Sequence, residues 1–258
     1  MNLMLSVESG DNDAFYRIQR ADRGIVYVAV FGEDFLPGHA RNHGPTVLAE
    51  LEKLDEWNTP WTTLTIHVGK GTTRCDLDRT PVPSVPKTYL LDEYPVYRFE
   101  SLRLVRKHKS RTSEVEIDGN VYFLKIARFP HEIPYVIQEL QSYHGLIDCP
   151  VTAKLVGYVY ETHADRVIGF LAGKLEGRVP NLGDLEACKT ALDTLHHYLI
   201  HGDLVKYNIV VTQQGPKFID FEDSVLQGTD AWSSSARDAE TKILEAKLAD
   251  ESGAGRPW

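Results

Sequence analysis

The stretch YLIHGDLVKYNIVVTQQGPKFIDFEDS, residues 198–224, decides the predicted fold of this chain. Residues 209–211 form a β-branched run, residues 213–216 are turn-forming types, and residues 218–219 form a second apolar run. This order is typical of two short strands joined by a tight turn. The stretch therefore predicts an antiparallel hairpin, which has a closed end at the turn and an open end opposite it.

Polar side chains gather at the open end of this hairpin. Asn208 precedes the first strand, Asp220 follows the second, and Asp203 lies on the loop that leads in. An amide and two carboxylates at one place form a hard-oxygen site of the kind that holds Mg²⁺ through substrate phosphates. The hairpin therefore predicts a phosphoryl-transfer centre.

Length, charge and cysteine content narrow the class of protein. The 258 residues, of which 42% are hydrophobic, suffice for one large or two small globular domains. A formal net charge of −9 argues against nucleic-acid or membrane-surface binding, which needs a broad basic face. Cys75, Cys149 and Cys188 lack metal-ligand spacing and are typical of reduced thiols. With no signal-peptide or membrane-span pattern, we expect a cytoplasmic protein. Nothing in the sequence indicates an oligomeric state.

Residues 1–95 contain few signals. A strand is predicted at 24–31, an amphipathic helix at 44–57 and a strand at 61–68. From 70 to 95, four prolines among polar residues predict a connector. Two interpretations stay open: an accessory module with its own function, or an extension that packs on the main domain. The pattern favours the extension.

From residue 96 the strand pattern becomes clear. Five strands and one helix are predicted, at 97–105, 113–117, 121–127, 131–144 (the helix), 153–160 and 167–172. Lys125 lies inside an apolar strand, where its burial is costly unless the ammonium is paired, although a lysine at a strand edge can also reach water. Glu139 borders the apolar stripe of the helix and is the predicted partner. Glu132 is the alternative, but acidic residues are common in a first turn because of the helix dipole.

The last part of the chain is predicted to be mainly helical around the hairpin. Apolar residues at three- and four-residue spacing predict a helix at 183–199, and a second helix is predicted at 237–248. His196 and His197 suggest a metal site, but neighbouring helical residues point about 100° apart. We therefore interpret them as cations that are favourable at a helix C-terminus.

Two motifs in the opening stretch resemble those of protein kinases. HGDLVKYN at 201–208 matches His-x-Asp-x-x-x-x-Asn, and IDFE at 219–222 matches Asp-Phe-x. With the strands and helix before them, they resemble the protein-kinase-like fold from residue 96 to about 224. The resemblance implies an α+β, two-lobed fold with a truncated C-lobe and an N-terminal extension. The implied domains are the extension at 1–95, a five-stranded N-lobe with one helix at 96–177, and a reduced helical C-lobe with the catalytic hairpin at 178–258.

The resemblance also implies roles for residues of the hairpin region. Asp203 looks like the catalytic base that accepts the proton of an attacking hydroxyl, while Asn208 and Asp220 look like Mg²⁺ ligands. Lys206 is placed in the catalytic set with Asp203. It follows Val205, which stands where protein kinases usually have a lysine.

The nucleotide-binding residues are implied in the same way. Lys125 would hold the α and β phosphates of ATP while paired with Glu139. The strip between the lobes, whose backbone groups pair with adenine, would contain Ala172, Gly173 and Leu175. Phosphoryl transfer needs mainly positioning and charge neutralisation from a protein, and this set of side chains supplies both.

The sequence departs from protein kinases at several places. RKHKSR at 106–111 stands where a glycine-rich loop is expected, and it is either a solvated basic turn or a cationic lid over the triphosphate. Glu222 replaces the glycine of Asp-Phe-Gly. The His-Gly-Asp and Asp-Phe-Glu forms resemble small-molecule kinases of the aminoglycoside and choline type, and short atypical kinases such as the RIO family share the reduced layout.

These features predict an ATP- and Mg²⁺-dependent phosphotransferase, a kinase-like transferase. The stretch after residue 224 is too short for an activation segment and a peptide-binding platform, so we expect a small-molecule or special non-peptide acceptor. No nucleic acid or membrane is expected as a partner. Two alternatives stay open: an inactive nucleotide-binding scaffold with a kinase fold, and a kinase fold redirected to another reaction.

Overall fold

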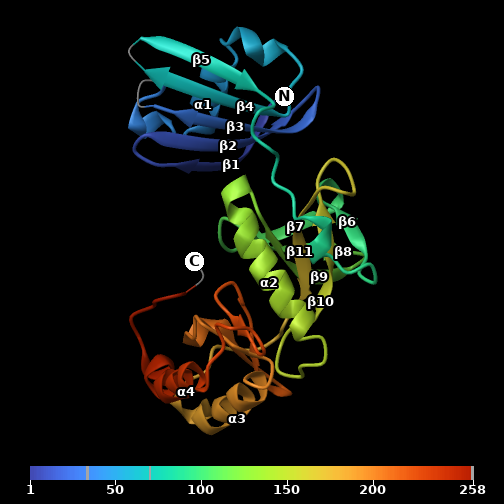
Figure 1. Cartoon of the computed structure of the whole chain (residues 1–258), viewed down its shortest axis with the longest axis vertical. Coiled ribbons are helices and arrows are strands. Elements are labelled where there is room, and N and C mark those ends of the chain that lie inside the picture. Colours follow the sequence, from blue (N-terminus) through green and yellow to red (C-terminus); the bar gives the residue numbers. More distant parts are fainter. Residues whose placement is uncertain (33–34, 70, 257–258) are drawn as a thin grey trace. The chain divides into compact units, whose positions relative to one another are not determined.

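The chain forms two compact units (Figure 1). The structure, a computed structural model, describes residues 1–32, 35–69 and 71–256. Unit 1 consists of Met1–Ser84, Ala127–Ile133 and Glu161–Arg166, and unit 2 consists of Val85–Ile126, Pro134–Tyr160 and Val167–Trp258. The division at residues 95 and 177 stays a prediction. None of the helices in the described ranges is both long and apolar enough to cross a lipid bilayer.

Unit 1 is built on a five-stranded sheet in the order β1-β2-β3-β4-β5. The strands are β1 (Leu3–Ser9), β2 (Asp13–Arg20), β3 (Gly24–Phe31), β4 (Thr63–Gly69) and β5 (Thr72–Leu77). β3 and β4 pair in parallel, so the chain must cross over one face of the sheet between them. The crossover contains α1 (Gly44–Leu51) and a 3₁₀ turn at Asp55–Asn58.

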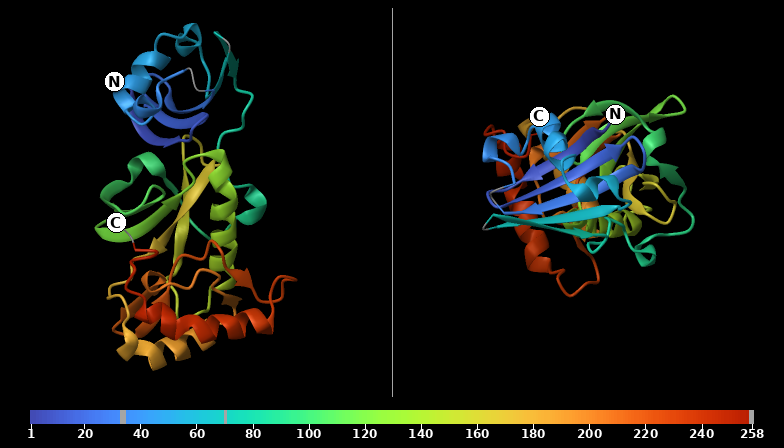
Figure 2. Two further views of the ribbon diagram at one scale, coloured as in Figure 1. Left: turned by 90° about the vertical axis from the view of Figure 1, so that its left-hand side faces the viewer. Right: turned by 90° about the horizontal axis from the view of Figure 1, so that it is seen from above.

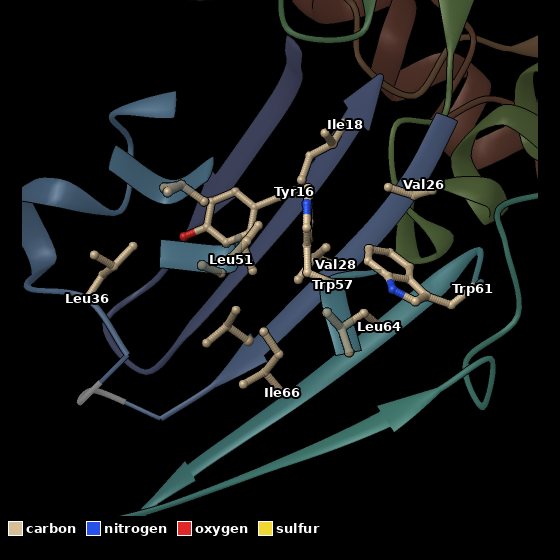
Figure 3. Packing of buried hydrophobic residues seen from close by; sticks show 13 residues of the cluster. Tyr16, Ile18, Val26, Val28, Leu36, Leu51, Trp57, Trp61, Leu64 and Ile66 are labelled. Atoms are coloured by element: carbon tan, nitrogen blue, oxygen red, sulfur yellow. The ribbon is translucent and has the colours of Figure 1, made fainter. Parts of the chain in front are cut away.

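The core of unit 1 lies between this crossover and the sheet. Figure 3 shows Tyr16, Leu64 and Ile66 of the strands packed with Leu51 of α1 and Trp57 of the 3₁₀ turn. All five side chains are buried. Burial of large apolar and aromatic side chains is the main free-energy gain of folding, so this unit has a core of its own.

Sequence patterns predict only part of unit 1. The strands β3 and β4 are confirmed, and the predicted helix ends earlier than expected, at Leu51. β5 lies in the segment that was predicted to be a connector, of which Lys70 is outside the described residues. β1 and β2 had no prediction. In β2, Arg17 and Arg20 are buried among apolar residues, which hides the alternation on which strand prediction depends.

A buried ion cluster accounts for Arg17. The carboxylate of Glu161, which is fully buried, accepts hydrogen bonds from Arg17, from Arg166 at 2.7 Å and from the hydroxyl of Tyr27. Burial works to lower the pKa of Arg17, but the Glu161 carboxylate outweighs it and holds that pKa above its ordinary value. The cluster lies entirely within unit 1.

Unit 2 begins with a six-stranded sheet in the order β6-β10-β11-β9-β8-β7. The strands are β6 (Val96–Arg98), β7 (Arg103–Lys107), β8 (Thr112–Ile117), β9 (Asn120–Ile126), β10 (Leu155–Tyr160) and β11 (Val167–Gly173). α2 (Ile133–Gly145) packs on it through Tyr143, whose ring meets that of Phe170 at 5.3 Å. The turn between β8 and β9 needs positive φ at Asp118 (49°) and Gly119 (79°), as its sequence predicts.

One predicted strand of unit 2 is wrong. Residues 97–105 do not form a continuous strand, because a 3₁₀ turn at Phe99–Ser101 separates β6 from β7. The two pieces lie at opposite edges of the sheet, so the chain must turn between them. Phe99 and Leu102 pack against the sheet core during this crossing, which explains why the segment reads as an apolar strand.

The rest of unit 2 surrounds the predicted hairpin, which is confirmed as β13 (Ile209–Thr212) and β14 (Gly215–Phe218). The helices α3 (Leu185–Leu195) and α4 (Ser234–Ala249) lie side by side, and α3 also packs against β14 (Figures 1 and 2). A short strand pair, β12 (Leu199–Ile200) and β15 (Val225–Leu226), flanks the hairpin. The two predicted helices are thus confirmed with shifted ends.

We predict that the buried cluster in unit 1 is essential to its stability. Glu161→Gln removes the charge that compensates two buried arginines, and breaking such a buried pair costs about 3–5 kcal/mol. Urea unfolding monitored by tryptophan fluorescence measures the loss. The control is Glu50→Gln, whose carboxylate pairs with Lys53 on the surface of α1 and should change the free energy of unfolding by less than about 1 kcal/mol. Similar small losses in both variants would contradict the interpretation.

Candidate active site

The ammonium of Lys125 is the centre of the candidate site in unit 2. Lys125 lies on β9, which is flanked by β8 and β11, and its side chain is 12% exposed. Its Nζ lies 2.6 Å from Glu139 Oε2 on α2 and 2.6 Å from Asp220 Oδ1 after β14. It also lies 2.8 Å from Glu222 Oε1. The structure thus contains the ion pair with Glu139 predicted from the sequence and adds two carboxylates to it.

The charged side chains of this cluster shift one another's pKa values. Burial works to lower the pKa of Lys125, but Glu139, Asp220 and Glu222 outweigh it and hold that pKa above its ordinary value. Burial raises the pKa of Glu139 to about 7, against the opposing effect of the ammonium. For Asp220, burial is again opposed by Lys125, and here the ammonium prevails and lowers the pKa. At neutral pH these directions favour a charged Lys125 next to a charged Asp220.

Glu222 belongs to this group, although sequence patterns give it no role. Besides Lys125, its carboxylate binds Arg111, whose Nη2 lies 2.7 Å from Glu222 Oε2. Arg111 comes from the turn between β7 and β8 and stacks over the ring of Tyr135, 5.4 Å from its centroid. In the sequence, the only signal for Glu222 is its position directly after Asp220 and Phe221, where protein kinases have a glycine.

The loop that precedes the hairpin carries the proposed base. Asp203 is exposed, and Asn208 Nδ2 donates to its backbone oxygen at 2.9 Å and to its Oδ2 at 3.3 Å. These donations leave Asn208 Oδ1 as the oxygen available to a ligand. Asp220 has a positive φ of 69°, which is uncommon for a residue with a Cβ. The hairpin thus brings Asp203, Asn208 and Asp220 to one end, as the spacing predicts.

Glu240 of α4 holds the backbone of this loop, and nothing in the sequence analysis identified it. Its carboxylate accepts hydrogen bonds from the amides of His201 at 3.1 Å and Gly202 at 2.9 Å, and from His196 at 2.8 Å. Burial works to raise the pKa of Glu240, but His196 and the two amides prevail and lower it. His196 lies at the C-terminus of α3, as its sequence position indicates, and is buried against this carboxylate. Lys206 is also buried, with its Nζ 3.0 Å from Glu251.

Several of the predicted site residues line a cavity of about 290 Å³. Its lining includes Lys125, Glu139, Asn208 and Asp220, together with the predicted strip residues Ala172, Gly173 and Leu175. Apolar side chains such as those of Phe170, Ile209 and Ile219 complete the walls. Asp203 and Lys206 are not part of the lining. A larger cavity of about 540 Å³ beside the end of α3 and α4 contains none of the predicted site residues.

The donor set of the smaller cavity fits Mg²⁺ and a nucleotide. Asp220 and Asn208 offer hard oxygen ligands, the ligand type that Mg²⁺ prefers. Lys125 offers a cation for phosphate oxygens, and the apolar walls suit a flat aromatic base. The bound metal would neutralise phosphate charge, while the chain's own residues hold and orient the nucleotide.

Comparison with known families agrees with this geometry. The RIO domain model matches residues 184–241, which run from the start of α3 through the loop and hairpin to α4. A search of curated proteins found no match. RIO domains are atypical kinase-like domains, so the match supports a kinase-like protein but not the aminoglycoside or choline type. With the sheet and α2 before the matched segment, the chain has an α+β, protein-kinase-like fold with a β-rich lobe and few helices.

We predict that Glu240 stabilises the loop only in its charged form. Glu240→Gln should lower the free energy of unfolding at pH 7 by about 1–3 kcal/mol, because a charged acceptor of three hydrogen bonds is lost. Since the folded-state pKa lies below the ordinary value of 4.5, this contribution is complete above pH 4.5 and is lost as the pH falls through the folded-state pKa. Urea titrations from pH 3 to pH 8 measure the difference, which should shrink at the acid end. Glu245→Gln, exposed on the same helix, is the control, and an equal loss in both variants would refute the role.

Proposed function

We propose that this protein is an ATP- and Mg²⁺-dependent phosphotransferase. The observation that carries the proposal is the position of the Lys125 ammonium, which contacts both Glu139 and Asp220 at a cavity that apolar side chains also line. A cation paired with a helix glutamate and facing an aspartate is the arrangement with which kinases hold nucleotide phosphates and metal. The RIO domain match over the loop and hairpin supports the same class.

Each residue has a defined task in this proposal. Lys125, oriented by Glu139, binds the α and β phosphates, and Asn208 and Asp220 hold the metal. Asp203 is exposed next to Asn208, where it would accept the proton of the attacking hydroxyl as the new bond to the γ-phosphorus forms and the bond to the β-phosphate oxygen breaks, releasing ADP. Lys206, assigned to the catalytic set by its position in the motif, binds Glu251 in this structure, so we give it no separate step.

We propose a small-molecule or special non-peptide acceptor. Between Asp220 and the start of α4 at Ser234, the only regular element is the short strand β15. This interval has no room for the long activation segment with which protein kinases position peptides. The net charge of −9 agrees with an enzyme that has no nucleic-acid or membrane partner, and the free cysteines Cys75, Cys149 and Cys188 support the proposed cytoplasmic location.

A nucleotide-binding scaffold without transferase activity is the second candidate. It is favoured by one observation: the carboxylates of Asp220 and Glu222 are already neutralised by Lys125 and Arg111. Metal and phosphate must therefore displace existing ion pairs before the site can work. A kinase fold redirected to another reaction would share this nucleotide site.

The proposal predicts that Mg²⁺-ATP binds at this site and is turned over. Calorimetry should detect ATP binding, and the melting temperature should rise with ATP concentration, because a ligand of the native state stabilises it. Lys125→Met should weaken binding by about tenfold or more, since it removes a charge-assisted contact. ADP formation is measured with water and with a panel of small hydroxyl- and amine-bearing compounds.

Asp203→Asn separates the candidates. It should leave ATP affinity unchanged and reduce ADP formation by a factor of about 10²–10⁴, the usual value of a general base. Asp193→Asn, exposed on α3, is the matched control and should keep full activity. Wild-type binding without any ADP formation would favour the scaffold, and no binding at millimolar ATP would reject both candidates. Undiminished turnover in Asp203→Asn would show that Asp203 is not the base.

A further inference from the structure

Two backbone amides of the turn between β7 and β8 are already hydrogen-bonded within the turn. The amides of His108 and Lys109 both donate to the carbonyl oxygen of Thr112, at 3.0 Å and 3.1 Å. A glycine-rich loop binds phosphates through free backbone N–H groups that line a concave surface. Here the amides of His108 and Lys109 are occupied inside the turn and are not available to phosphate, so a side chain is needed to replace them.

The turn is held in place at both ends. His108 lies 2.9 Å from Glu114, and the same carboxylate binds Lys174 at 3.2 Å. The ring of His108 lies against that of Phe123, with centroids 5.4 Å apart. At the other end, Arg111 binds Glu222 at 2.7 Å. The side chains at the two ends of the turn, His108 and Arg111, are therefore engaged with carboxylates.

Lys109 lies between His108 and Arg111 and differs from them in its contacts. Its side chain is exposed and lines the cavity that also contains Lys125, Asn208 and Asp220. Within the described ranges its ammonium forms no ion pair or hydrogen bond, yet its charge lies close enough to help lower the pKa of Asp220. Lys107, two residues earlier, is equally exposed but is not part of the cavity lining.

We propose that Lys109 is a phosphate-binding residue, whose ammonium replaces the backbone amides of a glycine-rich loop and contacts the terminal phosphates of the nucleotide. This inference rests on the proposed function. The four-carbon stem of a lysine reaches into the cavity from a turn whose backbone stays fixed, and its ammonium is a compact charge suited to phosphate oxygens. The sequence left two interpretations open for residues 106–111, a solvated basic turn and a cationic lid over the triphosphate. The proposal favours the second and assigns the phosphate contact to Lys109 alone.

The test compares nucleotides that differ only in their phosphates. Calorimetric affinities for AMP, ADP and ATP are measured, with and without Mg²⁺, for the wild type, Lys109→Met, Lys109→Arg and Lys107→Met. Lys109→Met should weaken ATP binding by about tenfold or more and leave AMP binding within about twofold, because only ATP reaches the lost charge. Lys109→Arg should keep most of the affinity, and Lys107→Met should match the wild type. Circular dichroism checks that each variant is folded.

The outcomes separate this inference from the proposed function. If the wild type binds ATP and Lys109→Met binds it equally well, Lys109 has no phosphate contact and the proposed function stands. If Lys107→Met loses as much affinity as Lys109→Met, the effect is that of general surface charge and the inference is refuted. If Lys109→Met weakens AMP and ATP alike, the residue affects the base or the fold and not the terminal phosphates, which also refutes it. If the wild type binds no ATP, both the inference on Lys109 and the proposed function are wrong.

Discussion

One buried ammonium determines how the parts of unit 2 must be arranged. A lysine placed in an apolar strand carries a large desolvation cost unless carboxylates surround it, and Lys125 receives three of them from two other parts of the chain. α2 must therefore lie against β9, and the segment after β14 must end beside the same strand. Burial raises the pKa of Glu139 to about 7 although the ammonium of Lys125 opposes it, so desolvation outweighs pairing at this carboxyl.

The residues that could be predicted from the sequence are those whose signal is local. The hairpin follows from a β-branched run, a turn and an apolar return, and the pairing of Lys125 with Glu139 follows from a charge inside an apolar strand and an acid at the edge of an apolar helix face. The order of the motifs then identifies Asp203, Asn208 and Asp220 as candidates. In the structure Asn208 contacts Asp203, and Asp220 lies at the same hairpin end.

The residues that could not be predicted depend on contacts between distant segments. Glu240 looks like an ordinary acid on an amphipathic helix, and only the folded chain shows that it faces the amides of His201 and Gly202. Arg17 and Glu161, 144 positions apart, become intelligible only as partners. The predicted strand at residues 97–105 is wrong for a related reason. Its apolar side chains belong to a segment that runs from one edge of the sheet to the other and not to one continuous strand. In each case the local sequence pattern does not show which distant segment the residues contact.

The backbone of Asp220 has a consequence for how this site is studied. At a φ of 69° an asparagine is tolerated almost as well as an aspartate, whereas an alanine has no side chain that compensates for the left-handed conformation. Replacement by alanine would therefore move the segment that carries Phe221 and Glu222 at the same time as it removes a carboxylate. Asparagine changes the charge alone. A loss of function in Asp220→Ala would therefore combine two causes. Comparison with Asp220→Asn would separate the loss of the carboxylate from the change in backbone conformation.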